Sequence, residues 1–345
     1  MRLNAKKHSS VKFLKGYGHS ISVKDSKIIL KDCHDPFSPP KIEKWFVKHM
    51  PYDRIILQGK GYVSTEGLSI LSENNKTVIL LDTQGNPLSM CHGLRDSFIA
   101  TKYRIAQYDA FRDKSNIDYL TQQITKAKIQ SQIEFLKSTN NHDVKEEIVK
   151  LSQSGLSEAV SSRIYFDNYS KLIDDRFGFT KRNSIKIEKR NATDVINALL
   201  NYGYAVLAGQ ISAYINGIGL DAYYGFMHKN HTSFQSLVYD LIEPFRWLVD
   251  YSVWKLSDAK SSNRISKKQY AHTRDGTVVL EYDLIRKFLE LLERTFQKEK
   301  QYDYKHGKKT RNGLKSVQEI TIAKIMIQNL AEFCSGKQKE FRIQG

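Results

Sequence analysis

The stretch VINALLNYGYAVLAGQISAYINGIGL, residues 195–220, is the longest uncharged segment of this 345-residue chain. Its length alone would allow a membrane-spanning helix. Several polar side chains within it, however, are costly to place in hydrocarbon: Asn197, Asn201, Gln210, Ser212 and Asn216. We therefore interpret the segment as a helix buried in a protein core, and we expect no association with a membrane.

The helical pattern extends in both directions from this segment. From Leu94 to the C-terminus, apolar residues recur at three- and four-residue spacing, and Pro244 is the only proline in that region. Within it, Thr232 and Gln235 have the spacing of a capping box at the start of a further helix. Because proline cannot donate a backbone hydrogen bond, we expect that helix to kink or pause at Pro244.

The first ninety residues follow a two-residue period instead. Ile21 and Val23 alternate with polar residues, the turn 24–27 follows, and residues 28–30 complete a hairpin. Further strands are predicted near residues 54–57, 61–64 and 77–82, with a short helix near 66–71. The fold class is therefore α+β: a small N-terminal β domain over residues 1–93, followed by a larger all-helical C-terminal domain over residues 94–345.

The formal net charge of +17 is concentrated at the two ends of the chain. Residues 1–60 carry +8 and residues 255–345 carry +9, whereas residues 61–254 are balanced. A basic excess of this size favours a polyanionic partner such as nucleic acid. A basic surface that serves only solubility would give the same count, so charge alone leaves both interpretations open.

The cysteines and the N-terminus indicate a cytoplasmic protein. Cys33, Cys91 and Cys334 lie far apart and form no CxxC pair, so they indicate neither a thiolate zinc site nor a disulfide framework. The first residues are not followed by an apolar segment of signal-peptide length. The sequence also lacks a phosphate-binding glycine loop, and ATP use is therefore not indicated.

A histidine and two carboxylates within sixteen residues could bind a divalent cation. His228 follows a glycine-rich approach, and Asp240 and Glu243 lie three residues apart, on one face of a helix. A surface carboxylate pair beside an unrelated histidine would show the same pattern. Glu158 could add a ligand, because serines at positions 161 and 162 keep its helix face small. Such a carboxylate and imidazole set suits Mn²⁺ or Mg²⁺ and phosphoryl chemistry.

These residues lie in stretches that resemble a known family. The stretches are GYAVLAGQISAYINGIGLDAYYGFMH (203–228), SLVYDLIEPFR (236–246), EAVSSRIYF (158–166), RIAQY (104–108) and the β-like region 54–71. Together they are similar to the CRISPR-associated spacer-acquisition integrase, a metal-dependent DNA endonuclease and integrase of antiviral defence. The likeness spans residues 50–250 and is weaker at both ends.

The resemblance implies a homodimer formed by the β domain and a helical catalytic domain with a metal site and a basic DNA-binding surface. Carried over motif by motif, Glu158, His228 and Glu243 are ligands of Mn²⁺ or Mg²⁺, and Asp240 is the adjacent catalytic carboxylate. The family acts on double-stranded and branched DNA, and joins spacers to a CRISPR repeat array by 3′-hydroxyl attack on a phosphodiester. A second CRISPR-associated adaptation protein bridges its dimers.

The chain departs from the family pattern at a few positions. Ala159 stands where glycine is common, serines 161 and 162 stand where alanines are common, and Glu243 stands where many relatives have aspartate. The last change lengthens the arm by one methylene and keeps a carboxylate ligand.

Other side chains are weaker candidates for DNA binding, and other functions stay open. Arg182 and Arg190 resemble basic positions that contact phosphate, although a solvated surface arginine is an equal interpretation. Arg163 is a further basic candidate, and Tyr165 could flank the metal or fill core volume. One alternative is a mobile-element integrase with the same fold. Another is a non-catalytic DNA-binding scaffold.

Overall fold

The computed structural model describes most of the chain. The described residues are 11–33, 39–82, 87–91, 93, 98–139, 158–182, 192–228, 235–258, 264–303, 314–341 and 343. The chain divides into two compact units. The first consists of residues 1–94 and 281–293, and the second of residues 95–280 and 294–345. Each unit is described separately below.

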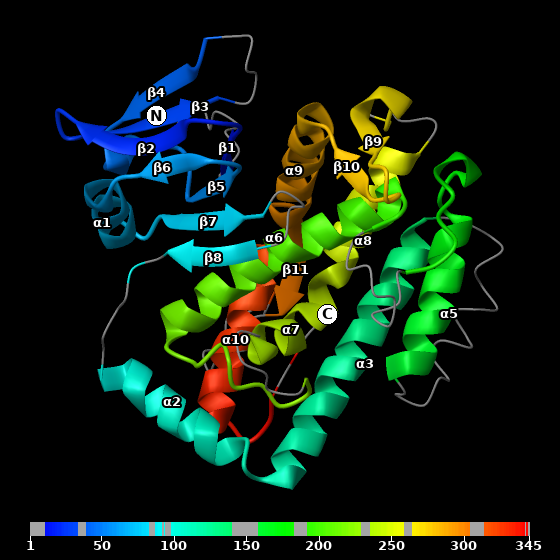
Figure 1. Cartoon of the computed structure of the whole chain (residues 1–345). Helices are drawn as coiled ribbons and strands as arrows, with labels where there is room; N and C mark the ends of the chain where they lie inside the picture. The colour runs from blue at the N-terminus through cyan, green and yellow to red at the C-terminus, as the bar shows by residue number, and fades with distance from the viewer. Residues whose placement is uncertain are drawn as a thin grey trace. The chain divides into compact units, whose positions relative to one another are not determined.

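The first unit contains two four-stranded sheets (Figure 1). One has the order β1 (Val11–Lys15), β5 (Arg54–Gln58), β7 (Thr77–Leu81) and β8 (Pro87–Cys91), and the other β4 (Lys41–Trp45), β3 (Lys27–Asp32), β2 (His19–Lys24) and β6 (Gly61–Val63). The first three strands of the first sheet are parallel. Helix α1 (Thr65–Glu73) contributes Leu71 to an apolar core that also contains Leu14, Ile21, Ile55 and Val78.

The predicted hairpin is confirmed and has a clear local cause. β2 and β3 pair antiparallel from Ser20 with Lys31 to Lys24 with Lys27. Between them Asp25 and Ser26 adopt φ values of +51° and +58°. Two left-handed residues match the twist of a two-residue hairpin turn. The predicted strands at 54–57, 61–64 and 77–82 and the helix at 66–71 are also confirmed, whereas β1, β4 and β8 were not predicted.

The second unit is mostly helical. Its helices are α2 (Phe98–Ala110), α3 (Lys114–Ser138), α5 (Glu158–Lys171), α6 (Val195–Ile218), α7 (Ser236–Ile242), α8 (Arg246–Ser257) and α10 (Glu319–Cys334). Helix α9 (Tyr282–Phe296) begins in the first unit and ends in the second. The unit also contains two small antiparallel strand pairs, so the expectation of an all-helical part was too simple. The pairs are β9 (Tyr270–His272) with β10 (Val278–Leu280) and β11 (Glu299–Asp303) with β12 (Leu314–Gln318).

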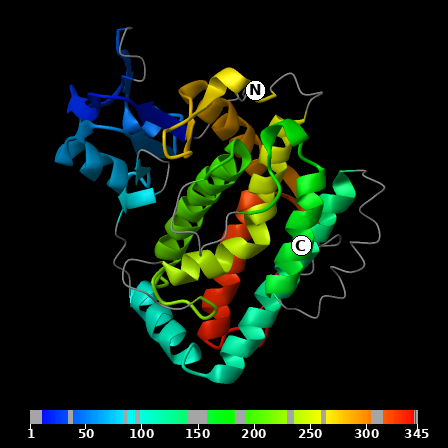
Figure 2. The same ribbon diagram turned by 45° about the vertical axis from the view of Figure 1, so that its right-hand side comes forward.

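Helix α6 is the buried centre of the second unit, as the sequence predicts. It packs against α7, α8 and α10 (Figures 1 and 2). Leu199, Leu207 and Ile211 on it have no exposed surface. No helix in the described ranges is both long and apolar enough to cross a membrane.

The predicted interruption at Pro244 is also confirmed. Helix α7 ends at Ile242, residues Glu243–Phe245 form one 3₁₀ turn, and α8 begins at Arg246. The predicted capping box is not tested in full, because Thr232 lies outside the described residues. Its other member, Gln235, is the N-cap residue of α7 and makes no side-chain cap hydrogen bond. The 3₁₀ turn places Glu243, one of the predicted metal ligands, at a break in the helix.

Candidate metal centre

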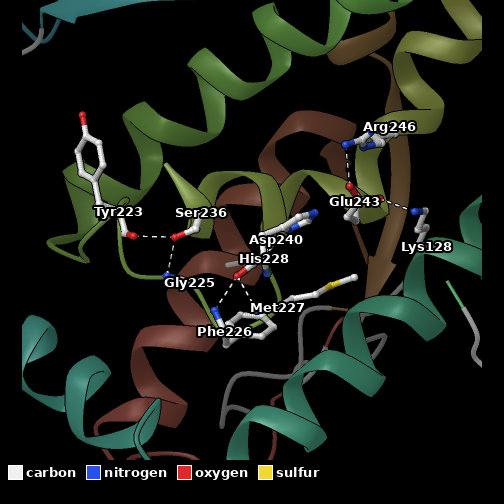
Figure 3. Close-up of polar contacts among 10 residues, drawn as sticks. All are labelled: Lys128, Tyr223, Gly225, Phe226, Met227, His228, Ser236, Asp240, Glu243 and Arg246. Carbon is white, nitrogen blue, oxygen red and sulfur yellow. Dashed lines mark hydrogen bonds and ion pairs between the residues drawn. The ribbon is translucent and has the colours of Figure 1, made fainter. Parts of the chain in front are cut away.

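His228 lies in the connection from α6 to α7, and Asp240 on α7 fixes its place. One oxygen of the Asp240 carboxylate, Oδ2, accepts hydrogen bonds from the backbone N–H groups of Phe226 at 2.7 Å and Met227 at 3.1 Å. The other, Oδ1, accepts the backbone N–H of His228 at 2.8 Å. Figure 3 shows these three residues gathered around the carboxylate. Asp240 has no exposed surface, so it holds the loop from inside the protein.

The same carboxylate also orients the imidazole ring. Nδ1 of His228 lies 2.7 Å from Oδ1 of Asp240. A carboxylate acceptor at Nδ1 favours the ring form in which Nδ1 carries the proton and Nε2 carries the lone pair, an arrangement common for metal-binding histidines. Asp240 therefore positions both the backbone and the ring of His228. Its predicted catalytic role stays a prediction.

The loop approaches α7 closely at Gly225. A Cβ atom there would lie 2.5 Å from Oδ2 of Asp240 and 2.8 Å from the backbone carbon of Ser236. Only glycine fits that space. Ser236 adds two bonds, because its Oγ accepts the N–H of Gly225 at 2.9 Å and donates to the carbonyl of Tyr223 at 2.6 Å. The glycine-rich approach seen in the sequence thus has a steric cause.

Helix α2 anchors the start of this loop through Gln107, which is fully buried. Its Nε2 donates to the carbonyls of Asp221 at 3.0 Å and Tyr224 at 2.7 Å, and its Oε1 accepts the N–H of Asp221 at 2.7 Å. Tyr108 donates to the Asp221 carboxylate at 2.7 Å. Residues 104–108 are one of the stretches that resemble the family, but the sequence alone does not predict that Gln107 and Tyr108 anchor this loop.

Glu243 is only 2% exposed and lies between two cations. Nζ of Lys128 on α3 is 2.6 Å from Oε2, and a guanidinium nitrogen of Arg246 is 2.8 Å from Oε1. Burial by itself would raise the pKa of Glu243, but Arg246, Lys128 and His228 together hold that pKa below its ordinary value. The carboxylate is therefore ionised at neutral pH, as a metal ligand must be.

Sequence reasoning missed both cations, although each had a signal. Arg246 follows Glu243 at helical i, i+3 spacing within the motif 236–246. Lys128 continues the apolar stripe formed by Leu120 and Ile124 on α3, where a lysine is unexpected. A charged residue on the buried face of a helix indicates a buried partner.

His228 and Glu243 fit a divalent metal by the chemistry of their donors. An oriented imidazole nitrogen and a buried, ionised carboxylate are ligands that Mn²⁺ and Mg²⁺ accept. No three His, Cys, Asp or Glu side chains in the described part of the chain lie close enough together to hold a metal ion. Glu158 is the first residue of α5, and its side chain lies outside the described residues. The three-ligand set therefore stays a prediction.

The predicted DNA-binding residues have different surroundings. Tyr165 is fully buried and donates to Oδ2 of Asp250 at 2.7 Å. The guanidinium group of Arg182 donates to Asn197 at 2.7 Å and to Asn201 at 2.9 Å, within the helical unit. Arg163 is exposed on α5. Arg190 lies outside the described residues. Their roles toward DNA are untested predictions, but the Tyr165 side chain fills core volume.

Asp250 connects this buried region to the candidate metal centre. Tyr165 and Tyr204 both donate hydrogen bonds to its carboxylate. Burial raises the pKa of Asp250 to about 6, and the two hydrogen bonds limit the rise. The Arg246 guanidinium lies 4.7 Å from the centre of the Tyr204 ring. The network thus supports, from the protein interior, one of the two cations that hold Glu243.

Known proteins are similar to this chain in sequence. The family model described as CRISPR associated protein Cas1 matches residues 13–294. The CRISPR-associated endonuclease Cas1 1 of Archaeoglobus fulgidus is 27% identical over 292 residues, covering 72% of this chain and 81% of that protein. The CRISPR-associated endonuclease Cas1 2 of Saccharolobus solfataricus is 29% identical over 244 residues, covering 68% and 71%.

Solved structures show the same fold. A casposase bound to an integration product has a TM-score of 0.83 at 25% identity, covering 96% of this chain and 92% of that chain. A Cas1 protein from Thermotoga maritima has a TM-score of 0.73 at 17% identity, covering 97% and 100%. A Cas6-RT-Cas1–Cas2 complex has a TM-score of 0.74 at 18% identity, covering 99% and 37%. Since the family model spans most of the sequence, this chain belongs to the CRISPR-associated Cas1 family.

Proposed function

We propose that this protein is a metal-dependent DNA endonuclease and integrase that joins spacers to a CRISPR repeat array. In the reaction a DNA 3′-hydroxyl attacks a phosphodiester. Two observations carry the proposal: Asp240 orients the His228 ring, and the nearby Glu243 is buried and ion-paired, both on motifs by which the chain resembles the family. The names of the curated Cas1 endonucleases and of the casposase bound to an integration product support this activity.

We propose that Nε2 of His228, the carboxylate of Glu243 and the side chain of Glu158 hold the cation, Mn²⁺ or Mg²⁺. When bound, such a cation polarises a phosphate oxygen and offsets the negative charge that develops during displacement. The protein's own contribution is preorganisation. Asp240 orients the His228 ring, and Lys128 with Arg246 keeps Glu243 ionised inside the protein.

The proposed substrate is double-stranded or branched DNA, held by the basic surface. Lys and Arg outnumber Asp and Glu by 54 to 37, so binding should weaken as salt rises. The scaffold alternative would share this charge, but it gives no reason for a buried carboxylate between two cations beside an oriented histidine. The family match and the curated relatives favour the CRISPR setting over a mobile-element integrase, and we propose that the protein acts in the cytoplasm.

We further propose that the first unit forms a homodimer. Several of its large apolar side chains are exposed: Tyr17, Ile42, Phe46, Tyr62 and Leu88. Exposed apolar groups on one unit support an interface with a second copy. A second adaptation protein would bridge such dimers, since the matching solved complex names Cas1 together with Cas2.

The test is strand transfer on branched DNA in the presence of Mn²⁺. Glu158→Ala, His228→Ala and Glu243→Ala are measured separately, each with a DNA-binding assay. We expect all three variants to bind DNA and to lose joining and nicking. A parent that binds DNA but neither joins nor nicks it would establish the scaffold alternative instead, and variants that react like an active parent would refute these residues as the ligands.

A further inference from the structure

Lys128 and Glu243 form a buried ion pair in addition to the pair between Arg246 and Glu243. The side chains are 6% and 1% exposed, and Nζ lies 2.6 Å from Oε2. Arg246 already provides a cation for the other oxygen of the same carboxylate, at 2.8 Å. Figure 3 shows Glu243 flanked by both cations. One buried carboxylate therefore faces two positive charges.

Two cations on one carboxylate have an electrostatic consequence. A buried carboxylate needs a partner, because an unpaired buried charge is strongly destabilising. Arg246 alone would meet that need. The ammonium group of Lys128 lies directly on Oε2, and a divalent cation bound to Glu243 would have to approach the same small group. Two positive charges this close together, the Lys128 ammonium and the divalent cation, repel each other strongly when solvent is excluded.

We propose that Lys128 competes with the divalent cation for Glu243. The lysine occupies one side of the carboxylate when no metal is bound, and it weakens the metal affinity of the site. This inference rests on the proposed function, because it takes Glu243 as a metal ligand. It assigns to Lys128, on α3, a role in setting the affinity of the site for the divalent cation.

Metal binding by the 345-residue chain, without DNA, tests the proposal independently of activity. Mn²⁺ is titrated into the protein, and the free ion is followed by electron paramagnetic resonance. Lys128→Met removes the ammonium and keeps most of the side-chain volume. Lys128→Gln removes the charge and keeps a polar head. We expect both variants to bind Mn²⁺ at least about tenfold more tightly than the parent, because the competing charge is gone.

Two controls on the same helix separate this effect from general charge loss. Lys126→Met makes the same charge change at an exposed position of α3, and should leave Mn²⁺ affinity within about twofold of the parent. Lys128→Arg keeps the positive charge and should also leave the affinity close to that of the parent. Circular dichroism of each variant identifies any that fails to fold.

The outcomes distinguish the two levels of the argument. If the parent binds Mn²⁺ and Glu243→Gln abolishes that binding, but neither folded neutral variant of Lys128 binds more tightly, the competition is refuted. Equal tightening by Lys126→Met also refutes it. If the parent binds no Mn²⁺, or Glu243→Gln binds as well as the parent, the metal centre itself is refuted and this inference with it.

Discussion

Asp240 and Glu243 are both buried and lie only three positions apart in sequence, yet their charges have different kinds of partner. Asp240 accepts the backbone N–H groups of three loop residues and faces the imidazole of His228. Glu243 is paired with the side-chain cations of Lys128 and Arg246. Backbone donors cannot leave without moving the loop, whereas side-chain cations can exchange. The Asp240 carboxylate is therefore suited to holding the loop in place, and the Glu243 carboxylate to binding a cation.

Exchanging each carboxylate for its amide tests whether the two residues have these different roles. The largest effect is expected for Glu243→Gln. Loss of an outer hydrogen-bond partner typically lowers metal affinity or activity 10- to 100-fold, so we expect the loss of the ligand itself to lower strand transfer by at least about 100-fold. Mn²⁺ binding should disappear as well. Glu134→Gln, at a half-exposed carboxylate paired with Lys300, is the matched control and should retain both properties.

At Asp240 the same exchange should act mainly through the loop. In Asp240→Asn the amide group would face backbone N–H groups, leaving buried donors without an acceptor. We expect a loss of unfolding free energy of about 2–4 kcal/mol. Urea denaturation measures it, and Mn²⁺ titration of the folded variant shows whether binding is weakened or abolished. A fully stable variant with no Mn²⁺ binding would make Asp240 a ligand and end the distinction.

Gln107 extends the comparison to a neutral group that holds the same loop. Gln107→Ala removes three hydrogen bonds to the backbone of Asp221 and Tyr224. At roughly 1 kcal/mol for each bond, we expect a loss of about 2–3 kcal/mol. Strand transfer should fall about tenfold through misplacement of His228. Gln122→Ala, at an exposed position of α3, should change neither stability nor activity.

The sequence predicts the locally determined parts of this arrangement well. The pause at Pro244, the buried helix α6 and the turn at residues 24–27 depend on neighbouring residues, and each is confirmed. The positions of His228, Asp240 and Glu243 came from motif likeness, and their contacts are a structural finding. Gln107 bonds to a residue 114 positions away, and no local pattern reveals such a partner. For Lys128 the local pattern indicates a buried partner without identifying Glu243, and no local pattern reveals the partners of Asp250.

The smallest expected effect concerns Tyr165, for which DNA contact and core packing were both open. Tyr165→Phe removes the hydrogen bond to Asp250, 85 residues away in sequence. We expect a loss of unfolding free energy of about 1–2 kcal/mol, with unchanged DNA affinity. Tyr223→Phe, at a half-exposed tyrosine, is the control.

The pH dependence of this loss identifies the carboxylate as its cause. Burial raises the pKa of Asp250 to about 6 in the folded protein, above its ordinary value of 3.8. The folded state therefore binds the Asp250 proton more tightly than the unfolded state, and the contribution of this group to stability falls as pH rises between these values. The Tyr165 hydroxyl limits that fall by donating to the ionised form. The Tyr165→Phe loss should thus be larger at pH 8 than at pH 5, whereas a loss independent of pH would mean that the hydroxyl does not act by stabilising the ionised form of Asp250.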